Sequence, residues 1–297
     1  MQIAKTFLSI LVFVLLSACV STSVKESTLG TIDVSPEMVL NSSPLGEGTE
    51  NLDLSSVDIL EMTPEMIEFV ESYMEGSTNR YRRMQRLVHA IIGDGNFNLV
   101  YDDKTRTASE TFTAARGNCL SFTNLFIAMA RYLEIHAEYQ EVDIPPDWSL
   151  AGESFFFSQH VNVLVDLGVG MQRVVDFNIY DFQPTYERRT ITDARGRAHY
   201  FSNIGVEHMM NGNNTLAYAN FRQALKEDSR FSPAWINMGI LHRREKYPNY
   251  AETSYKQALE IYQFNLIAMS NLANLYEEEG KSEWAEQYKD RVRLHRM

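Results

Sequence analysis

The stretch that decides the fold runs from Thr107 to Leu133 and reads TASETFTAARGNCLSFTNLFIAMARYL. After Cys119, apolar side chains recur at intervals of three and four residues, at Phe122, Leu125, Phe126, Met129 and Leu133. This spacing predicts an amphipathic helix with one buried face. Gly117 and Asn118 supply a turn and a candidate N-cap just before it. We therefore expect Cys119 to lie at the start of a buried helix.

A cysteine at a helix start is a candidate nucleophile. The first amide N–H groups of a helix have no partner within the helix, and the helix dipole places positive charge there. Both effects favour a thiolate, and the same N–H groups can form an oxyanion hole. The structural alternative is that Cys119 is only a small buried hydrophobic residue.

A β-hairpin is predicted downstream of this helix. Residues 160–167 and 173–178 alternate apolar and polar side chains, and the Gly168-Val169-Gly170 segment between them is a turn signal. If Val169 centres the turn, position 160 pairs with 178 and position 162 with 176. Two more helical patterns precede the deciding stretch, over residues 63–75 and 79–92.

The expected hairpin register brings His160 and Asp176 onto one face as diagonal neighbours. At that distance a carboxylate can orient an imidazole. A register shifted by one residue would move Asp176 to the other face, and Asn178 and Asp181 are then the alternative orienting residues. Taken singly, His160 and Asp176 each have an ordinary structural explanation.

A cysteine at a helix start followed by His and Asp on adjacent strands resembles the transglutaminase-like superfamily, which shares its core with papain-like cysteine proteases. The resemblance covers roughly residues 57–185. The matching motifs are Arg116-Gly117-Asn118-Cys119, Gln159-His160-Val161-Asn162-Val163 and Val174-Val175-Asp176-Phe177. The resemblance implies an α+β domain of transglutaminase-like or papain-like cysteine protease type.

The resemblance also implies roles for individual residues. Cys119 would be the nucleophile, His160 the general base and acid, and Asp176 the residue that orients the imidazole. The reaction would be acyl transfer from an amide through a thioester, to water or to an amine. The candidate residues for an oxyanion hole or for the wall of the cleft are Asn118, Gln159 and Trp148. No metal and no cofactor is implied.

The C-terminal third is a repeat with a period of 34 residues. Small residues recur at this spacing, as at Gly205 and Gly239, and so do apolar and aromatic residues, as at Phe201, Trp235 and Met269. This pattern resembles the tetratricopeptide repeat. It predicts an all-α domain of three repeats over residues 201–297, and such domains usually bind a protein partner.

The N-terminus resembles the export signal of a bacterial lipoprotein. Lys5 precedes an apolar run over residues 7–16, which is too short for an ordinary membrane-spanning helix. Leu16-Ser17-Ala18-Cys19 resembles a lipobox, so residues 1–18 are predicted to be a signal peptide and Cys19 to be lipidated. A plain secreted protein is the alternative. Val20 favours the outer membrane in a Gram-negative host, with the protein facing the periplasm.

Composition limits the remaining choices. Residues 19–56 are rich in Ser, Thr, Gly, Pro and acidic residues, which predicts a flexible tether. The formal net charge of −12 argues against nucleic acid or anionic lipid as the main partner. Two cysteines cannot form a disulfide scaffold or a cysteine-rich metal site. The transglutaminase-like domain is then expected over residues 57–200.

The sequence as a whole indicates a membrane-anchored peptidase or amidase that acts on a protein or peptide, with a repeat domain for protein binding. The first alternative is a non-catalytic envelope scaffold, in which the repeats and an inherited cleft only hold partners. The second is a structural link between layers of the envelope.

Overall fold

The structure is a computed structural model that describes residues 33–74, 76, 79–92, 97, 99–144, 160–177 and 186–296. The predictions for the signal peptide, Cys19, Trp148 and Gln159 lie outside these residues, as do the alternative orienting residues Asn178 and Asp181. Residues from Asp33 onward form one compact unit. In the part of the chain that is described, no helix is long and apolar enough to cross a membrane.

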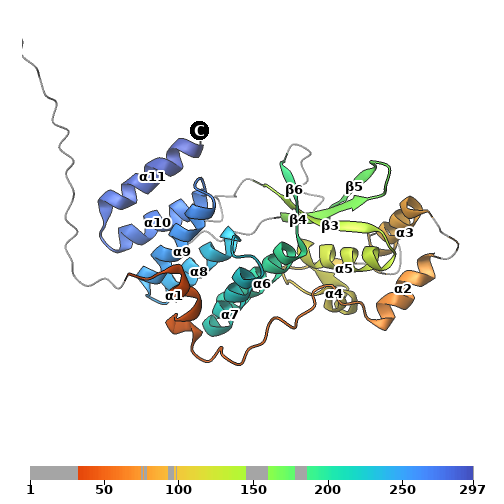
Figure 1. Ribbon diagram of the computed structural model, residues 1–297, viewed down its shortest axis with the longest axis horizontal. Helices are drawn as coiled ribbons and strands as arrows, with labels where there is room; N and C mark the ends of the chain where they lie inside the picture. Colours follow the sequence, from red (N-terminus) through yellow and green to blue (C-terminus); the bar gives the residue numbers. More distant parts are fainter. Residues whose placement is uncertain are drawn as a thin grey trace, which may run out of the picture. The chain divides into compact units, whose positions relative to one another are not determined.

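The first half of this unit combines helices with a small sheet (Figure 1). Both predicted early helices are present, with closely similar bounds. The four helices are α2 (Pro64–Met74), α3 (Arg80–Ile92), α4 (Ala108–Ala114) and α5 (Cys119–Tyr132). A capping box begins α4, because Thr107 and Glu110 each bond the backbone N–H of the other.

The main sheet is antiparallel and has the strand order β5-β4-β3-β6. Its strands are β3 (His136–Val142), β4 (His160–Asp166), β5 (Gln172–Val175) and β6 (Arg188–Ile191). A short parallel pair joins β1 (Val100–Tyr101) to β2 (Arg116–Gly117). Helix α5 packs on β3 and β4, where the Tyr139 hydroxyl donates a buried 2.7 Å hydrogen bond to Asn124.

The hairpin between β4 and β5 has the register that the sequence predicts. Val163 pairs with Val175, and Asp166 pairs with Gln172. Continuing this register places Asn162 opposite Asp176, which makes His160 and Asp176 diagonal neighbours.

Six helices follow the sheet and stack as three antiparallel pairs. They are α6 (Asp193–Met210), α7 (Asn214–Glu227), α8 (Ser232–Arg244), α9 (Pro248–Ile261), α10 (Leu266–Glu278) and α11 (Ser282–Arg296). The second helices of the pairs begin at residues 214, 248 and 282, a constant spacing that is compatible with the predicted repeats. The first of these helices begins at Asp193, so the helical region starts earlier than the predicted boundary at residue 201.

Glycines at equivalent positions allow the helices of a pair to approach closely. A Cβ atom on Gly205 would lie 2.5 Å from the ring of Phe221, and a Cβ on Gly239 would lie 2.5 Å from the ring of Tyr255. Both distances are too short for real contacts, so these positions require glycine.

The prediction of a flexible tether over residues 19–56 is wrong for residues 33–56. This segment forms α1 (Pro36–Asn41) and a short 3-10 helix, η1 (Pro44–Gly46). Val39 is fully buried, and the Tyr218 hydroxyl bonds the carbonyls of Val39 and Leu40 at 3.0 and 2.7 Å. The polar composition did not indicate that two valines of this segment are buried, or that side chains of α7 and α9 bond its backbone carbonyls. These contacts hold the segment against the two helices.

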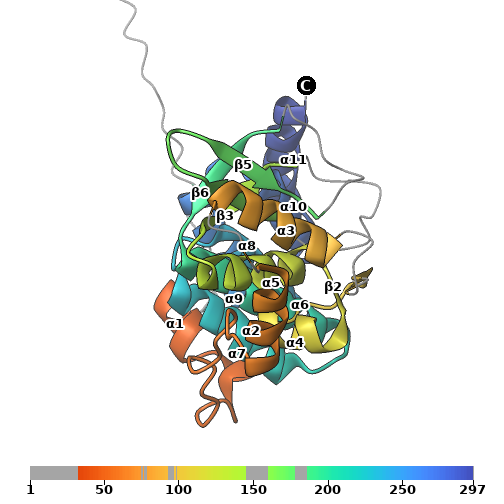
Figure 2. The same ribbon diagram turned by 90° about the vertical axis from the view of Figure 1, so that its right-hand side faces the viewer.

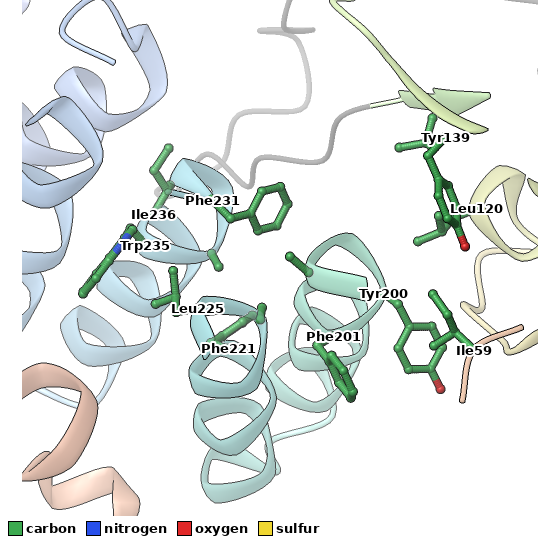
Figure 3. Close-up of a cluster of buried hydrophobic side chains, with 14 of the residues drawn as sticks. Ile59, Leu120, Tyr139, Tyr200, Phe201, Phe221, Leu225, Phe231, Trp235 and Ile236 are labelled. Atoms are coloured by element: carbon green, nitrogen blue, oxygen red, sulfur yellow. The ribbon is translucent and has the colours of Figure 1, made fainter. Parts of the chain in front are cut away.

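One hydrophobic core runs from the sheet into the helices. Figure 3 shows part of it, with Leu120 and Tyr139 on one side, Tyr200 and Phe201 of α6 in the middle, and Trp235 of α8 beyond. A buried ionic cluster crosses the same junction, because Glu141 of β3 accepts hydrogen bonds from Arg195 and His199 of α6, both at 2.7 Å. The helices are therefore packed directly against the sheet domain.

Candidate active site

The start of α5 is fixed by the side chain of Asn118. Its Oδ1 accepts a 3.0 Å hydrogen bond from the backbone N–H of Ser121, and its Nδ2 donates a 2.7 Å bond to Thr105 Oγ1. These bonds make Asn118 the N-cap, as predicted, and place Cys119 in the first position of the helix. Asn118 therefore positions the start of the helix, and its contribution to the oxyanion hole stays a prediction.

Gly117 lets the chain pass close to the first turn of α5. A Cβ atom at this position would lie 2.4 Å from Cβ of Ser121. A larger residue would therefore push the N-cap and Cys119 away from their positions. This steric limit explains why a glycine precedes Asn118 and Cys119.

The imidazole of His160 is held by a carboxylate. Its Nε2 donates a 2.8 Å hydrogen bond to Oδ1 of Asp176, and Nδ2 of Asn162 donates a 2.9 Å bond to Oδ2 of the same carboxylate. The side chains of His160 and Asp176 are only 7% and 9% exposed, so water competes little for these bonds. The hairpin thus brings together two of the three predicted site residues.

The thiol of Cys119 completes the group. It is half-buried, and it lies close enough to His160 to raise the pKa of the imidazole. Because Nε2 is occupied by Asp176, Nδ1 is the ring nitrogen left for the thiol. Cys119, His160 and Asp176 therefore form a continuous chain of polar contacts from α5 to the hairpin.

The surroundings of His160 favour its charged form. Burial opposes protonation, but the hydrogen bonds to Asp176 and Cys119 and their negative charges outweigh it. The pKa of His160 is raised from 6.5 to about 9. At neutral pH the imidazole is therefore an imidazolium beside the sulfur atom of Cys119.

Asn162 is a site residue that the sequence analysis quoted in a motif without giving it a role. It is fully buried and lies on the same face of β4 as His160. The role of Asn162 could have been predicted from the sequence, because the expected hairpin register already places position 162 opposite Asp176. Its hydrogen bond fixes the second carboxylate oxygen, so that the first one points at His160.

No group of three His, Cys, Asp or Glu side chains within the described residues could hold a metal ion. The polar groups of the site are instead bonded to one another. What this arrangement can do by itself is move a proton between a thiol and an imidazole whose charge a carboxylate stabilises.

A comparison with known protein families indicates the class of domain that contains this site. Residues 67–164 match the family model of the transglutaminase-like superfamily. The matched range includes Cys119 and His160 and ends before Asp176. A search of curated proteins found no match to the chain. The chain therefore carries a transglutaminase-like domain, with a mixed sheet and helix architecture.

Proposed function

We propose that this protein is a cysteine acyl-transfer enzyme, a peptidase or amidase, that acts on an amide of a protein or peptide. The observation that carries the proposal is the arrangement in which His160 lies beside Cys119 and bonds the buried carboxylate of Asp176. A transglutaminase-like domain over most of this region supports the same class of chemistry.

In the first half of the reaction, the Cys119 thiolate attacks the carbonyl carbon of the amide. The His160 imidazolium gives its proton to the leaving nitrogen, the C–N bond breaks and a thioester forms. Asp176 stabilises the imidazolium before this transfer and keeps the ring in place. The backbone N–H of Cys119, at the start of α5, is the donor we assign to the developing oxyanion.

In the second half, water or an amine attacks the thioester. His160, now neutral, accepts the proton of the attacking group, and the thiolate of Cys119 leaves. Water gives hydrolysis and an amine gives cross-linking. The same three side chains serve both outcomes.

We also propose that the six C-terminal helices are tetratricopeptide repeats that bind a protein partner. The sequence signals at the N-terminus support an anchor at Cys19 in a bacterial envelope, with the body facing the periplasm. These two proposals are independent of the acyl-transfer chemistry.

The test of the enzyme proposal is alkylation by iodoacetamide, which reacts with thiolates and needs no knowledge of the substrate. The protein is the full chain in mild detergent with Cys19→Ser, so that Cys119 is its only thiol. We expect fast labelling near neutral pH, and a strong reduction in His160→Asn. The matched control is His136→Asn, since His136 lies exposed on the neighbouring strand β3.

A second readout is acyl transfer itself. We expect p-nitrophenyl acetate to release p-nitrophenol and to leave an acetyl thioester on Cys119, detectable by mass spectrometry and absent in Cys119→Ala. Slow labelling in the parent protein, unchanged by His160→Asn, would contradict the proposal. It would favour the non-catalytic scaffold, for which Cys119→Ala should retain full function in cells.

A further inference from the structure

The tip of the β4–β5 hairpin, residues 168–171, exposes apolar side chains. Val169 is fully exposed, and Met171 and Val174 beside it are 44% and 40% exposed. Scattered exposed apolar residues are normal, but Val169 and Met171 lie two positions apart on one turn, and Val174 follows on β5.

The backbone of the hairpin tip makes Val169 more unusual. Gly168, Val169 and Gly170 have φ values of +82°, +54° and +74°. Glycine adopts such angles freely, whereas a β-branched residue does so only with strain. The protein thus holds a valine in a strained conformation although its side chain contacts solvent alone, and such strain is typical of functional positions.

An arginine-rich helix lies beside this apolar tip. Helix α3 begins Arg80-Tyr81-Arg82-Arg83 and contains no acidic residue. A Cβ atom at Gly168 would lie 4.0 Å from Nη1 of Arg80, so α3 and the hairpin tip are neighbours, as Figures 1 and 2 both show. Arg82 of α3 and Arg173 of β5 are also exposed.

The acidic residues near the tip have partners of their own. The carboxylate of Asp166 accepts the N–H of Gly168 at 2.8 Å, and Glu138 lies 3.5 Å from His136. Helix α3, with four arginines and no acidic residue, is basic in a chain whose formal net charge is −12. An anionic partner is attracted to this face specifically, because the rest of the protein repels it.

We propose that the hairpin tip and the exposed arginines of α3 form a docking surface for an anionic phospholipid membrane. Val169 and Met171 would enter the interfacial region, and Arg80, Arg82 and Arg173 would bind lipid phosphates. A protein partner fits less well, since two or three small side chains on a turn provide far less area than a stable protein interface needs.

This surface acts in addition to any lipid on Cys19 and does not depend on acyl transfer. Docking through the hairpin would restrict the orientation of the sheet domain against the bilayer. Docking would therefore give the sheet domain a second contact with the membrane besides the lipid. Stable anchoring generally combines two such signals.

The test measures local contact with lipid in the full chain, because the N-terminal apolar segment alone could attach the protein to vesicles. The background is Cys19→Ser with Cys119→Ala. An environment-sensitive fluorophore, NBD, is attached at Gln172→Cys beside the tip or, as the matched control, at Gln287→Cys on α11; both glutamines are exposed. Vesicles contain phosphatidylethanolamine with either phosphatidylglycerol or phosphatidylcholine.

We expect a blue-shifted, stronger emission at position 172 with phosphatidylglycerol vesicles only, and no change at position 287. Arg80→Gln with Arg82→Gln should weaken this response by roughly fivefold for each arginine. Arg293→Gln on α11 is the matched control and should leave it unchanged. Raising the salt concentration should weaken the response further.

Val169→Gly separates docking from folding. It removes the exposed side chain and the backbone strain together, so the thermal unfolding midpoint should stay the same or rise while the lipid response falls. Leu294→Ala, which removes an apolar side chain that is 67% exposed on α11, should leave the response intact. Equal emission with both vesicle types would overturn the proposal. A blue shift that grows with protein concentration without vesicles would overturn it too, by assigning the tip to contact between copies.

Discussion

Two buried histidines, one in each half of the molecule, show opposite behaviour. His160 at the candidate active site has its pKa raised to about 9, whereas His242 in α8 has its pKa lowered to about 4. Burial disfavours the charge in both cases. His242 donates from Nδ1 to the carbonyl of Met238 and accepts at Nε2 from the Ser43 hydroxyl, and neither partner is charged.

His199 shows that a nearby carboxylate is not enough to reverse the effect of burial. Its Nε2 donates to Glu141 at 2.7 Å, yet its pKa is lowered, because complete burial dominates and Arg195 and Arg189 lie close by. His160 differs because Asp176 and Cys119 both raise its pKa and together outweigh the effect of burial. The comparison indicates that a reactive histidine is marked by the sum of the charges around it.

The largest expected effect comes from removing the charge of Asp176. Asp176→Asn keeps the shape but lowers the pKa of His160, so the imidazolium and the thiolate beside it are both disfavoured. We expect the rate of acetyl transfer from p-nitrophenyl acetate to fall by on the order of a hundredfold or more. Asp166→Asn, at the far end of the same hairpin, is the control; an equal loss there would mean that hairpin folding was measured instead.

The next expected effect is on the free energy of unfolding. Its dependence on pH has opposite signs for His160 and His242. The folded-state pKa of His160 is above the ordinary 6.5, so its contribution is fully present below pH 6.5 and is lost as the pH rises through about 9. The free energy of unfolding of the parent relative to His160→Asn should fall by on the order of 3 kcal/mol across that range. Urea unfolding at several pH values measures it.

For His242 the folded-state pKa is depressed, so the contribution of the neutral ring is present above pH 6.5 and is lost as the pH falls towards about 4. The same titration with His242→Asn should therefore show its change on the acid side. If both variants changed the free energy of unfolding in the same pH range, the proposed difference between His160 and His242 would be wrong.

A smaller effect is expected from crowding the helix pairs. Gly239→Ala places a methyl group against Tyr255 and should lower the free energy of unfolding by about 2 kcal/mol. The iodoacetamide rate at Cys119 should not change, because the contact is internal to α8 and α9. The matched control is Ser282→Ala, at the exposed start of α11. Gly212→Ala is unsuitable as a control because Gly212 has a positive φ.

The smallest effect should come from Ser43→Ala, which leaves Nε2 of His242 without its 2.8 Å partner. We expect a loss of about 1 kcal/mol in the free energy of unfolding. Amide hydrogen exchange in residues 36–46 should become faster, while exchange in α5 should not. Ser56→Ala, at an exposed position before the sheet domain, is the matched control.

Much of the candidate site could be predicted because local rules fix it. The glycines around Val169 set the turn, the turn sets the register, and the register places Asp176 beside His160. Asn118 is recognisable as an N-cap from its position before an apolar helical pattern. The 34-residue spacing likewise follows from the sequence, since each pair of helices repeats the same contacts.

Other features could not be predicted because they depend on distant partners. Strand β3 contains the buried charge of Glu141, which argues against a buried strand until Arg195 and His199 are known to surround it. The segment over residues 33–56 is similar, because its order comes from α7 and α9 about two hundred positions later. Trp148 and Gln159 remain predictions.

The fastening of this segment changes how far the body could move if Cys19 carries lipid. Thr253 of α9 bonds the carbonyl of Val34 at 2.7 Å, so the chain leaves the folded unit there and not at Val57. From Cys19 a fully extended chain reaches at most about 50 Å to Val34, compared with about 130 Å to Val57. A shorter tether raises the local concentration of the folded unit near a membrane that holds Cys19 and puts distant targets out of range.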